Sequence, residues 1–356
     1  MIEDFSCPVC NSPNWHTIER FRFVRQSASR SQRVLRKLVR LLEVLAQNGP
    51  SNRLLHGEVA ATQGSRARTE VFFDLWFGGL SVVNLKTIYC EQCGFGCYSP
   101  RPEERDLDAK YMHLAAARSK SGEQDFKSLP LESLDLRQSR IIRLLGPVLN
   151  QTPSDILDFG GGQGHLIAAF ATQGHRCHVV DYGDRTLPSV TRLGQTIHDV
   201  DRSIKFDLIV CSHVLEHLAE PVKVLVSLRE LLSSVGKIYV EIPLEIHGGI
   251  RIEHDPVTHV NFFTPASLEN TAQAAGLRVT QRQLERVRYG DTEIDAVWCL
   301  AERDGTERDG PRVTPDIAKH LQPGRSRLFR RYVKQTLSLL GRQLTRSRFG
   351  QRSLPT

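Results

Sequence analysis

A glycine-rich stretch preceded by one acid is the clearest place in this sequence for holding a ligand. Residues 157–166 read LDFGGGQGHL. The stretch supplies one carboxylate and then four glycines: Asp158, Gly160, Gly161, Gly162 and Gly164. Glycine has no Cβ, so a backbone this rich in glycine can turn sharply and lie directly against a ligand. The run before it is apolar and β-rich and the run after it is helical, which is where open α/β sheets bind ligands.

The spacing of the glycines narrows the class of ligand. A dinucleotide fingerprint requires G-x-G-x-x-G, but counting from Gly160 the third glycine would fall on His165. A phosphate-binding P-loop requires a Gly-Lys-Ser or Gly-Lys-Thr ending, and the stretch has none. An NAD-dependent oxidoreductase acting on sugars is therefore disfavoured, and a cofactor without a pyrophosphate is favoured.

The spacing Asp-x-Gly-x-Gly-x-Gly resembles that of the class I S-adenosylmethionine-dependent methyltransferases. The resemblance implies that S-adenosylmethionine is the cofactor and that the glycine backbone lies against its adenosyl and methionine parts. It also implies that Asp158 receives the methionine ammonium. With the cysteine segments described below, the resemblance covers roughly residues 5–18, 88–112 and 130–303.

Two further acids follow later strands. Asp181 ends the next predicted strand, 23 residues after Asp158, where a carboxylate can accept both ribose hydroxyls. Tyr182 comes next, and we expect it to line the adenosyl pocket. Asp199 follows a short third strand, and the resemblance implies that it contacts the adenine amino group. A solvated acid in a turn is the alternative for Asp199.

The fourth predicted strand, FDLIVC (206–211), runs into a Leu-Glu-His turn. The resemblance implies that Cys211, Ser212 and His213 border the methionine end of the cofactor. Glu216 and His217 could take part in catalysis, but we expect this pair to organise the loop after the strand.

Histidines also lie in the sequence RIEHDPVTHVNFFTPASL (251–268), a predicted loop on the substrate side of the crevice. A histidine can remove a proton from a hydroxyl, or from a carbon beside a carbonyl, at neutral pH. We therefore expect His259 to be the proton acceptor, with His254 and His217 as rivals. Helix capping or backbone contacts are the alternative for the two loop histidines.

The N-terminal part contains two CxxC pairs, formed by Cys7, Cys10, Cys90 and Cys93. Four thiolates in two knuckles suit tetrahedral Zn²⁺, so we expect a structural zinc. These segments resemble the zinc-binding lead segment of bacterial methyltransferases, including the C-methyltransferases of deoxysugar pathways. The pairs are 79 residues apart, because a basic helical stretch at about 20–85 looks inserted.

Charge and missing motifs bear on the partner. The formal net charge is +7, and basic residues gather in the insert and after Asp316. These ends could attract phosphates or an anionic membrane surface. A zinc-ribbon adaptor that binds nucleic acid or membranes through them, with the sheet as scaffold, is the alternative function. The fourth strand ends in Cys-Ser-His-Val, without the Asn/Asp-Pro-Pro-aromatic stretch of nucleobase amine methyltransferases, so we do not expect a nucleic-acid acceptor.

Short apolar runs alternate with helical patterns over the middle of the chain, which predicts a parallel sheet with crossover helices. The expected strands are 155–159, 176–181, 206–211, 237–243 and 294–302, and the expected helices are 131–149, 165–173, 221–232 and 265–275. The last helix carries its own boundary signals: Thr264 as N-cap, Pro265 at the first position and Gly276 as the stop.

These observations predict an α/β protein with a Rossmann-like, doubly wound, mostly parallel seven-stranded sheet and a small N-terminal zinc-ribbon-like module. The expected boundaries are 1–105 for the module, 106–303 for the methyltransferase domain and 304–356 for a basic tail. The sequence contains neither an 18-residue apolar run nor a signal peptide, so we expect a cytoplasmic enzyme. We expect it to methylate carbon or oxygen of a small polar acceptor, such as a nucleotide-sugar or a cell-surface or secondary-metabolite precursor, with peripheral membrane contact through the tail.

Overall fold

The fold is taken from a computed structural model, which describes residues 1–25, 54–57, 65–121, 131–149, 152–245, 256–289 and 292–304. His254, most of the expected basic insert and the basic tail after residue 304 lie outside these ranges. None of the described helices is both long and apolar enough to span a membrane.

A seven-stranded sheet forms the larger layer, in the order β11-β12-β9-β8-β5-β6-β7. Five of its strands run parallel: β5 (Asp155–Phe159), β6 (Arg176–Val180), β7 (Val190–Gly194), β8 (Phe206–Ser212) and β9 (Leu232–Pro243). The antiparallel pair β11 (Leu277–Tyr289) and β12 (Thr292–Arg303) completes it through β9. The chain order reverses between β5 and β8, and a ligand crevice forms at the carboxyl ends of such neighbours.

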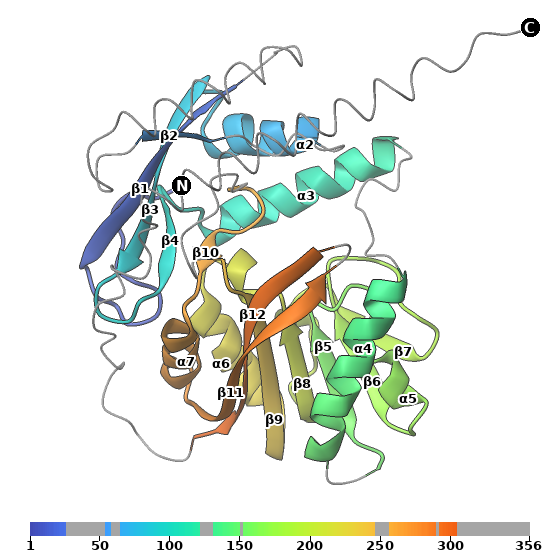
Figure 1. The fold of residues 1–356 in the computed structure, drawn as a ribbon. Coiled ribbons are helices and arrows are strands. Elements are labelled where there is room, and N and C mark those ends of the chain that lie inside the picture. The colour runs from blue at the N-terminus through green and yellow to red at the C-terminus, as the bar shows by residue number, and fades with distance from the viewer. Residues whose placement is uncertain are drawn as a thin grey trace, which may run out of the picture.

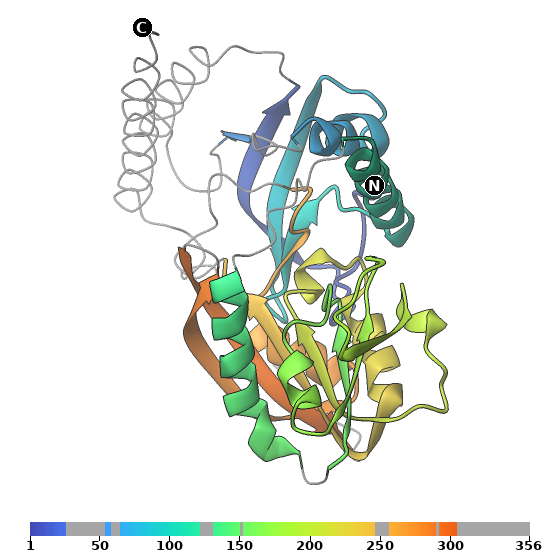
Figure 2. The same cartoon turned by 90° about the vertical axis from the view of Figure 1, so that its right-hand side faces the viewer.

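Each face of this sheet is covered by its own helices (Figures 1 and 2). Side chains along the strands alternate between the two faces. Ile156, Leu208 and Val210 belong to a core with α4 (Leu131–Leu145) and α5 (Ala168–Ala171). Leu157 and Ile209 point to the other face, where α6 (Pro221–Leu231) and α7 (Pro265–Ala274) pack. The period of two in each strand therefore builds two apolar layers, as expected for a doubly wound fold.

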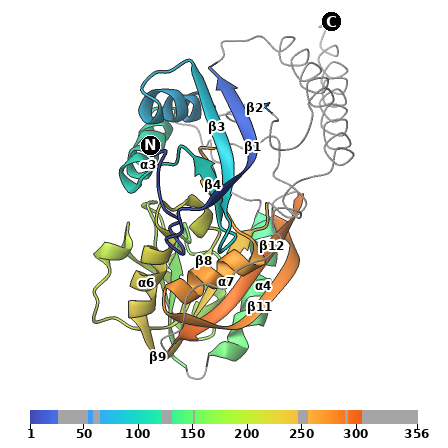
Figure 3. The ribbon, with the colours of Figure 1, turned by 90° about the vertical axis from the view of Figure 1, so that its left-hand side faces the viewer.

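The N-terminal part forms a second, five-stranded sheet, in the order β10-β4-β3-β1-β2. Its strands are β1 (Trp15–Val24), β2 (Leu54–Gly57), β3 (Val82–Cys90), β4 (Gly96–Ser99) and β10 (Asn261–Phe262). Strand β10 comes from the C-terminal half of the chain, so the five-stranded sheet contains residues from both halves. Helix α2 (Ser65–Glu70), the π-helical turn η1 (Val71–Trp76) and helix α3 (Glu104–Ser121) accompany this sheet. Figures 1 and 3 show the sheet and α3 above the edge where β5 and β8 end.

The expected insert is narrower than its sequence boundaries suggested. Strands β1 and β3 pair antiparallel from Trp15 opposite Cys90 to Val24 opposite Val82. The predicted insert at about 20–85 therefore includes sheet residues, at 20–24 and 82–85. Their buried side chains Phe21, Phe23 and Val83 belong to the N-terminal core. The N-terminal part is correspondingly larger than a compact ribbon.

Most expected elements of the seven-stranded sheet are present, with two differences. Helix α5 covers only Ala168–Ala171 of the expected 165–173, because the chain first turns through the bond from Ile167 N to Gly164 O. Strand β11 was not marked from sequence. It is an edge strand with mostly exposed side chains, and a register shift between Val279 and Gln281 interrupts its alternation.

The start of α7 is a sharp local prediction that the structure confirms. The Thr264 hydroxyl accepts a hydrogen bond from Ser267 N at 3.0 Å, Pro265 opens the helix, and Gly276 adopts φ +72° after it. Thr264→Ala should lower the free energy of unfolding by about 1 kcal/mol, because this acceptor is lost. Urea unfolding followed by far-UV circular dichroism measures the change. Thr264→Ser keeps the oxygen and should match the wild type; equal losses in both variants would contradict the capping role.

Candidate active site

The glycine loop leaves β5 in a backbone conformation that needs glycine. Gly160 has φ +71° and donates its N–H to Val180 O at 2.8 Å, which ties the loop to β6. A Cβ on Gly160 would lie 2.6 Å from Val214 Cγ2. Gly162 and Gly164 also have positive φ, at +60° and +82°. The main chain is therefore bare at the carboxyl end of β5, as the sequence predicted.

Asp158 is buried beneath this loop, with a relative exposure of 1%. Neither carboxylate oxygen has a hydrogen-bond partner among the described residues. A Cβ on Gly161 would lie 2.1 Å from Oδ2, so the carboxylate packs directly against that glycine. Burial raises the pKa of Asp158 to about 7; the nearby Asp181 charge adds to the rise and the Arg137 charge opposes it. A buried carboxylate without donors is a group that a cationic ligand would complete.

Asp181 lies directly after β6, against the glycine loop. Its Oδ2 accepts from Gly162 N at 3.0 Å, and its Oδ1 accepts from Gly183 N at 2.7 Å. A carboxylate oxygen can accept more than one hydrogen bond, so both can also receive ribose hydroxyls. Tyr182 is half-exposed, and its ring stacks on Tyr111 of α3 with centroids 4.8 Å apart and planes at 17°. The expected adenosyl side of the crevice thus has an aromatic wall built from both halves of the chain.

Asp199 has a structural role in this conformation. Its Oδ2 accepts from Gln195 N at 2.8 Å and Thr196 N at 2.9 Å, at the start of the 3₁₀ turn η3 (Ile197–Asp199). These backbone bonds lower the pKa of Asp199. The side chain is exposed. Asp199 therefore matches the alternative interpretation, in which the acid caps a solvated turn. A contact between Asp199 and adenine stays a prediction.

Arg137 of α4 lies near Asp158 and Ser212, and sequence reasoning missed it. Its Nη2 donates to Ser212 Oγ at 3.1 Å and lies 3.9 Å from Glu241 Oε1. Its guanidinium is close enough to Asp158 to lower the pKa of that acid. The sequence could have indicated this residue, because Arg137 lies four residues before Ile141 and therefore on the inward face of an amphipathic helix. Cys211 itself is buried in the apolar core below the loop.

Glu241 of β9 holds this corner together. Ser212 Oγ, Tyr239 OH and Arg140 Nη1 donate to its carboxylate at 2.9, 2.7 and 2.6 Å. Burial alone would raise the pKa of Glu241, but the charges of His213 and Arg140 outweigh it and hold the pKa well below its usual range. This carboxylate is ionised and matched by donors, so its network positions α4 and Arg137 over the end of β8.

Titratable side chains also gather on the other side of β8, around the 3₁₀ turn η4 (Leu215–His217). His217 Nδ1 lies 2.6 Å from Thr258 O, and the rings of His217 and His259 are 4.8 Å apart. His259 Nδ1 lies 2.9 Å from Glu245 Oε2. Glu216 is 1% exposed, and neither of its oxygens has a hydrogen-bond partner among the described residues. The structure therefore brings His217 and His259 together; His254 lies outside the described residues.

Burial and neighbouring charges act differently on these groups. Burial, together with the charges of His259 and Lys110, lowers the pKa of His217 well below its usual value. Burial also opposes protonation of His259, but the Glu245 carboxylate outweighs it and raises the pKa of His259. Burial raises the pKa of Glu216. His217 contacts a second loop through its bond to Thr258 O, and Glu245 is a partner of His259 that sequence reasoning missed.

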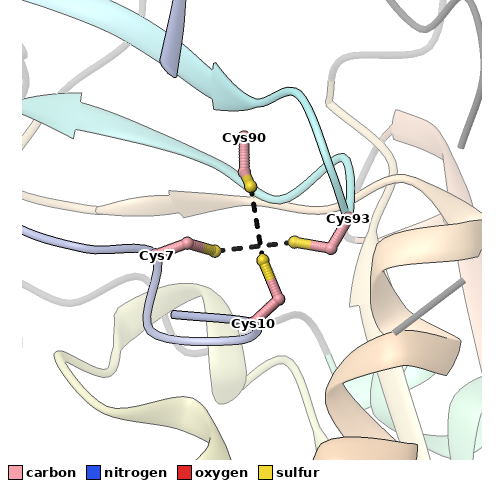
Figure 4. Close-up of side chains that lie close together, drawn as sticks. All are labelled: Cys7, Cys10, Cys90 and Cys93. Carbon is pink, nitrogen blue, oxygen red and sulfur yellow. Dashed lines mark hydrogen bonds between the residues drawn. The ribbon is translucent and has the colours of Figure 1, made fainter. Parts of the chain in front are cut away.

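The four cysteines of the CxxC pairs converge, with all four sulfur atoms within 4.8 Å of one another (Figure 4). Cys7 Sγ lies 3.5 Å from Cys93 Sγ, and Cys10 Sγ lies 3.4 Å from Cys90 Sγ. Tetrahedral Zn–S bonds of about 2.3 Å place sulfur atoms about 3.8 Å apart, so the arrangement fits a tetrathiolate site.

The pairing of β1 with β3 explains how the two cysteine pairs meet across 79 residues. Each knuckle closes with a backbone bond, from Asn11 N to Cys7 O and from Gly94 N to Cys90 O. Asn11 and Gly94 have positive φ, at 58° and 75°. Asn270 of α7 donates to Cys93 O at 3.1 Å, which attaches the second knuckle to the larger sheet layer.

The site lies in a part of the chain that is similar to a known protein family. Residues 133–282 match the family model described as "Methyltransferase domain". These residues include the glycine loop, the acids Asp181 and Asp199, and the histidines His217 and His259. Residues 133–282 therefore form a methyltransferase domain. The comparison with curated proteins gives no match.

Solved structures similar to this chain are distant in sequence. One is a 1,6-didemethyltoxoflavin-N1-methyltransferase from Burkholderia thailandensis, with 17% identity, a TM-score of 0.47, and coverage of 59% of this chain and 96% of that one. A methyltransferase from Methanosarcina mazei has 14% identity, a TM-score of 0.37, and coverage of 45% and 97%. A TehB-like methyltransferase from Corynebacterium glutamicum has 17% identity, a TM-score of 0.35, and coverage of 56% and 100%.

Because Asp158 is buried without a hydrogen-bond partner among the described residues, we expect ligand affinity at this site to depend on pH. Its pKa of about 7 means that lowering the pH through neutrality protonates the carboxyl and removes its attraction for the ligand ammonium. The affinity for S-adenosylhomocysteine, a stable analogue, should fall about tenfold between about pH 8 and about pH 6. Isothermal titration calorimetry measures this. Asp158→Asn should bind more weakly at both pH values and without the slope; the same slope in that variant would assign the titration to another group.

Proposed function

We propose that the protein transfers the methyl group of S-adenosylmethionine to carbon or oxygen of a small polar acceptor. A nucleotide-sugar, or another precursor of cell-surface or secondary metabolites, is the proposed class. The observation that carries the proposal is the group formed by buried Glu216 and half-buried His217 and His259 beside the end of β8. Buried titratable groups at the substrate side of a crevice suit proton removal from an acceptor. S-adenosylmethionine supplies an electrophilic methyl group on its sulfonium.

On the cofactor side, the chain offers one group for each polar part of the ligand. Asp158 would receive the methionine ammonium, and Arg137 would bind the methionine carboxylate. Asp181 would hold the ribose hydroxyls. Support comes from the unpartnered oxygens of Asp158 and from the placement of Arg137 between Asp158 and Ser212. Because these groups are held by the sheet and by Glu241, the cofactor would bind in a preorganised orientation.

On the acceptor side, we assign proton removal to the group around His259. Glu245 and Thr258 orient the two imidazoles of this group. The N-terminal part also contacts this loop: Lys110 Nζ of α3 donates to Val257 O at 3.0 Å, and Arg68 of α2 donates to Thr258 Oγ1. These contacts support a role for the N-terminal part in shaping the acceptor pocket.

We also propose that Cys7, Cys10, Cys90 and Cys93 bind a structural zinc ion. The support is the convergence of four sulfur atoms and the closed turns around them. A zinc ion would supply a cross-link between the two knuckles. Because Cys93 is attached to α7 through Asn270, such a cross-link would also fix the N-terminal part against the larger sheet layer.

The role of Arg137 can be tested with ligand fragments. Arg137→Gln should weaken S-adenosylhomocysteine binding about 10- to 100-fold, because a hydrogen bond between charged groups contributes about 1.5–3 kcal/mol. It should leave the affinity for 5′-methylthioadenosine, which lacks the amino-acid part, unchanged. Calorimetry with both ligands separates the two effects. Arg143→Gln on the exposed face of α4 is the matched control. Asp181→Ala should weaken both ligands. Equal losses for both ligands in Arg137→Gln would indicate a structural role instead.

The acceptor can be found by mass spectrometry of a nucleotide-sugar pool incubated with the full-length enzyme and S-adenosylmethionine. One member should gain a single CH₂ unit. His259→Gln should lose this product while retaining S-adenosylhomocysteine binding, because His259 is placed on the acceptor side. His254→Gln tests the rival histidine, and His198→Gln, an exposed position, is the control. A pool without any methylated member, given intact cofactor binding, would contradict the nucleotide-sugar assignment.

A further inference from the structure

The group of Glu216, His217 and His259 has a geometry that proton removal alone does not explain. Each residue offers one ligand atom, and the three atoms lie within 4.8 Å of one another. Two chain segments hold the group in place. Val260 N donates to Glu216 O at 2.9 Å, and Asn261 Nδ2 donates to Leu215 O at 2.8 Å. The two chain segments that carry the three side chains are thus tied to each other by hydrogen bonds.

Both imidazoles have their Nδ1 atoms occupied by acceptors. Thr258 O lies 2.6 Å from His217 Nδ1, and a carbonyl only accepts, so this nitrogen carries the proton. The lone pair of His217 is therefore on Nε2, 3.8 Å from Glu216 Oε1. Glu245 Oε2 occupies His259 Nδ1 at 2.9 Å, so Nε2 is the nitrogen of that ring outside the contact with Glu245. Metal-binding histidines are oriented in this way, with Nδ1–H bonded to a carbonyl or a carboxylate.

Glu216 provides an independent observation. Its carboxylate is 1% exposed, and both oxygens lack a hydrogen-bond partner among the described residues. The nearest imidazole nitrogens, His213 Nδ1 and His217 Nε2, are 3.6 and 3.8 Å from Oε1, beyond hydrogen-bond distance. An unpartnered buried carboxylate is costly, and a bound cation would offset this cost.

We propose that Glu216, His217 and His259 bind a divalent transition-metal cation. Two imidazole nitrogens and one carboxylate oxygen suit zinc, iron(II), manganese or cobalt, and three protein ligands leave coordination positions open. Ligand atoms around such a cation lie about 3.4 Å apart, so the observed 3.8 Å between His217 and Glu216 needs only a small side-chain rotation. With the cation bound, His259 would be a metal ligand and not the proton acceptor. A role of this cation in binding the acceptor rests on the proposed function; the cation site itself does not.

Cobalt(II) titration of the tag-free, metal-depleted full chain tests this inference, because the two sites have different donors. We expect two equivalents to bind: one with the intense near-ultraviolet charge-transfer band of cobalt thiolate, from the cysteines, and one with only weak visible bands. Glu216→Gln should weaken the second equivalent at least about tenfold and leave the first unchanged. Glu245→Gln should weaken the second about 10- to 100-fold, since it removes the support of His259. His198→Gln is the control and should bind like the wild type.

Binding of the thiolate equivalent alone in the wild type would overturn the proposal. So would a second equivalent whose affinity is the same in Glu216→Gln and Glu245→Gln as in the wild type. Should Glu216→Gln fail to fold, the Glu245→Gln affinity decides. S-adenosylhomocysteine binding, measured on the same samples, tests the proposed function separately. If the wild type does not bind this ligand, the methyl-transfer site is contradicted, whereas the number of cobalt equivalents bound is unaffected.

Discussion

Burial of charge at the carboxyl edge of the seven-stranded sheet is the constraint on which the site depends. Three carboxylates lie there with almost no exposure, and the chain treats them differently. Glu241 receives donors from three residues and anchors the corner. Asp158 and Glu216 have none among the described residues. Because an unpartnered buried carboxylate is costly, these two mark where ligands would complete the structure, one on each side of the end of β8.

The N-terminal part is joined to this edge, so it is part of the site's architecture. Strand β10 belongs to the five-stranded sheet, where it pairs with β4, and it follows directly after the loop that carries His259. Lys110 and Arg68 hold the same loop from the other side. The cysteine knuckles share an apolar core with strands β5, β8 and β9. Changes in the N-terminal part would therefore reach the acceptor side through packed side chains and shared strands.

Local patterns explain why much of the large sheet was predictable. The four parallel strands expected at 155–159, 176–181, 206–211 and 237–243 are mostly buried, so apolar residues dominate their sequences. The α7 boundaries follow from Thr264, Pro265 and Gly276. Strand β11 was not predicted because a bulge and exposed side chains interrupt the alternation of apolar and polar residues. The N-terminal sheet was not predicted because long stretches of chain separate β1, β2 and β3, and because its edge strand β10 comes from the C-terminal half.

By itself, the sequence determined those features that depend on residues near one another in the chain. The positive backbone angles of the glycine loop and the turns of both cysteine knuckles are of this kind, because glycine or asparagine sets them locally. The tertiary structure decided which distant residues meet. Arg137 reaches Ser212, Glu245 reaches His259, and Cys7 reaches Cys93 only through strand order and pairing. No local pattern encodes these distances, since each is set by the packing of elements that are far apart in sequence.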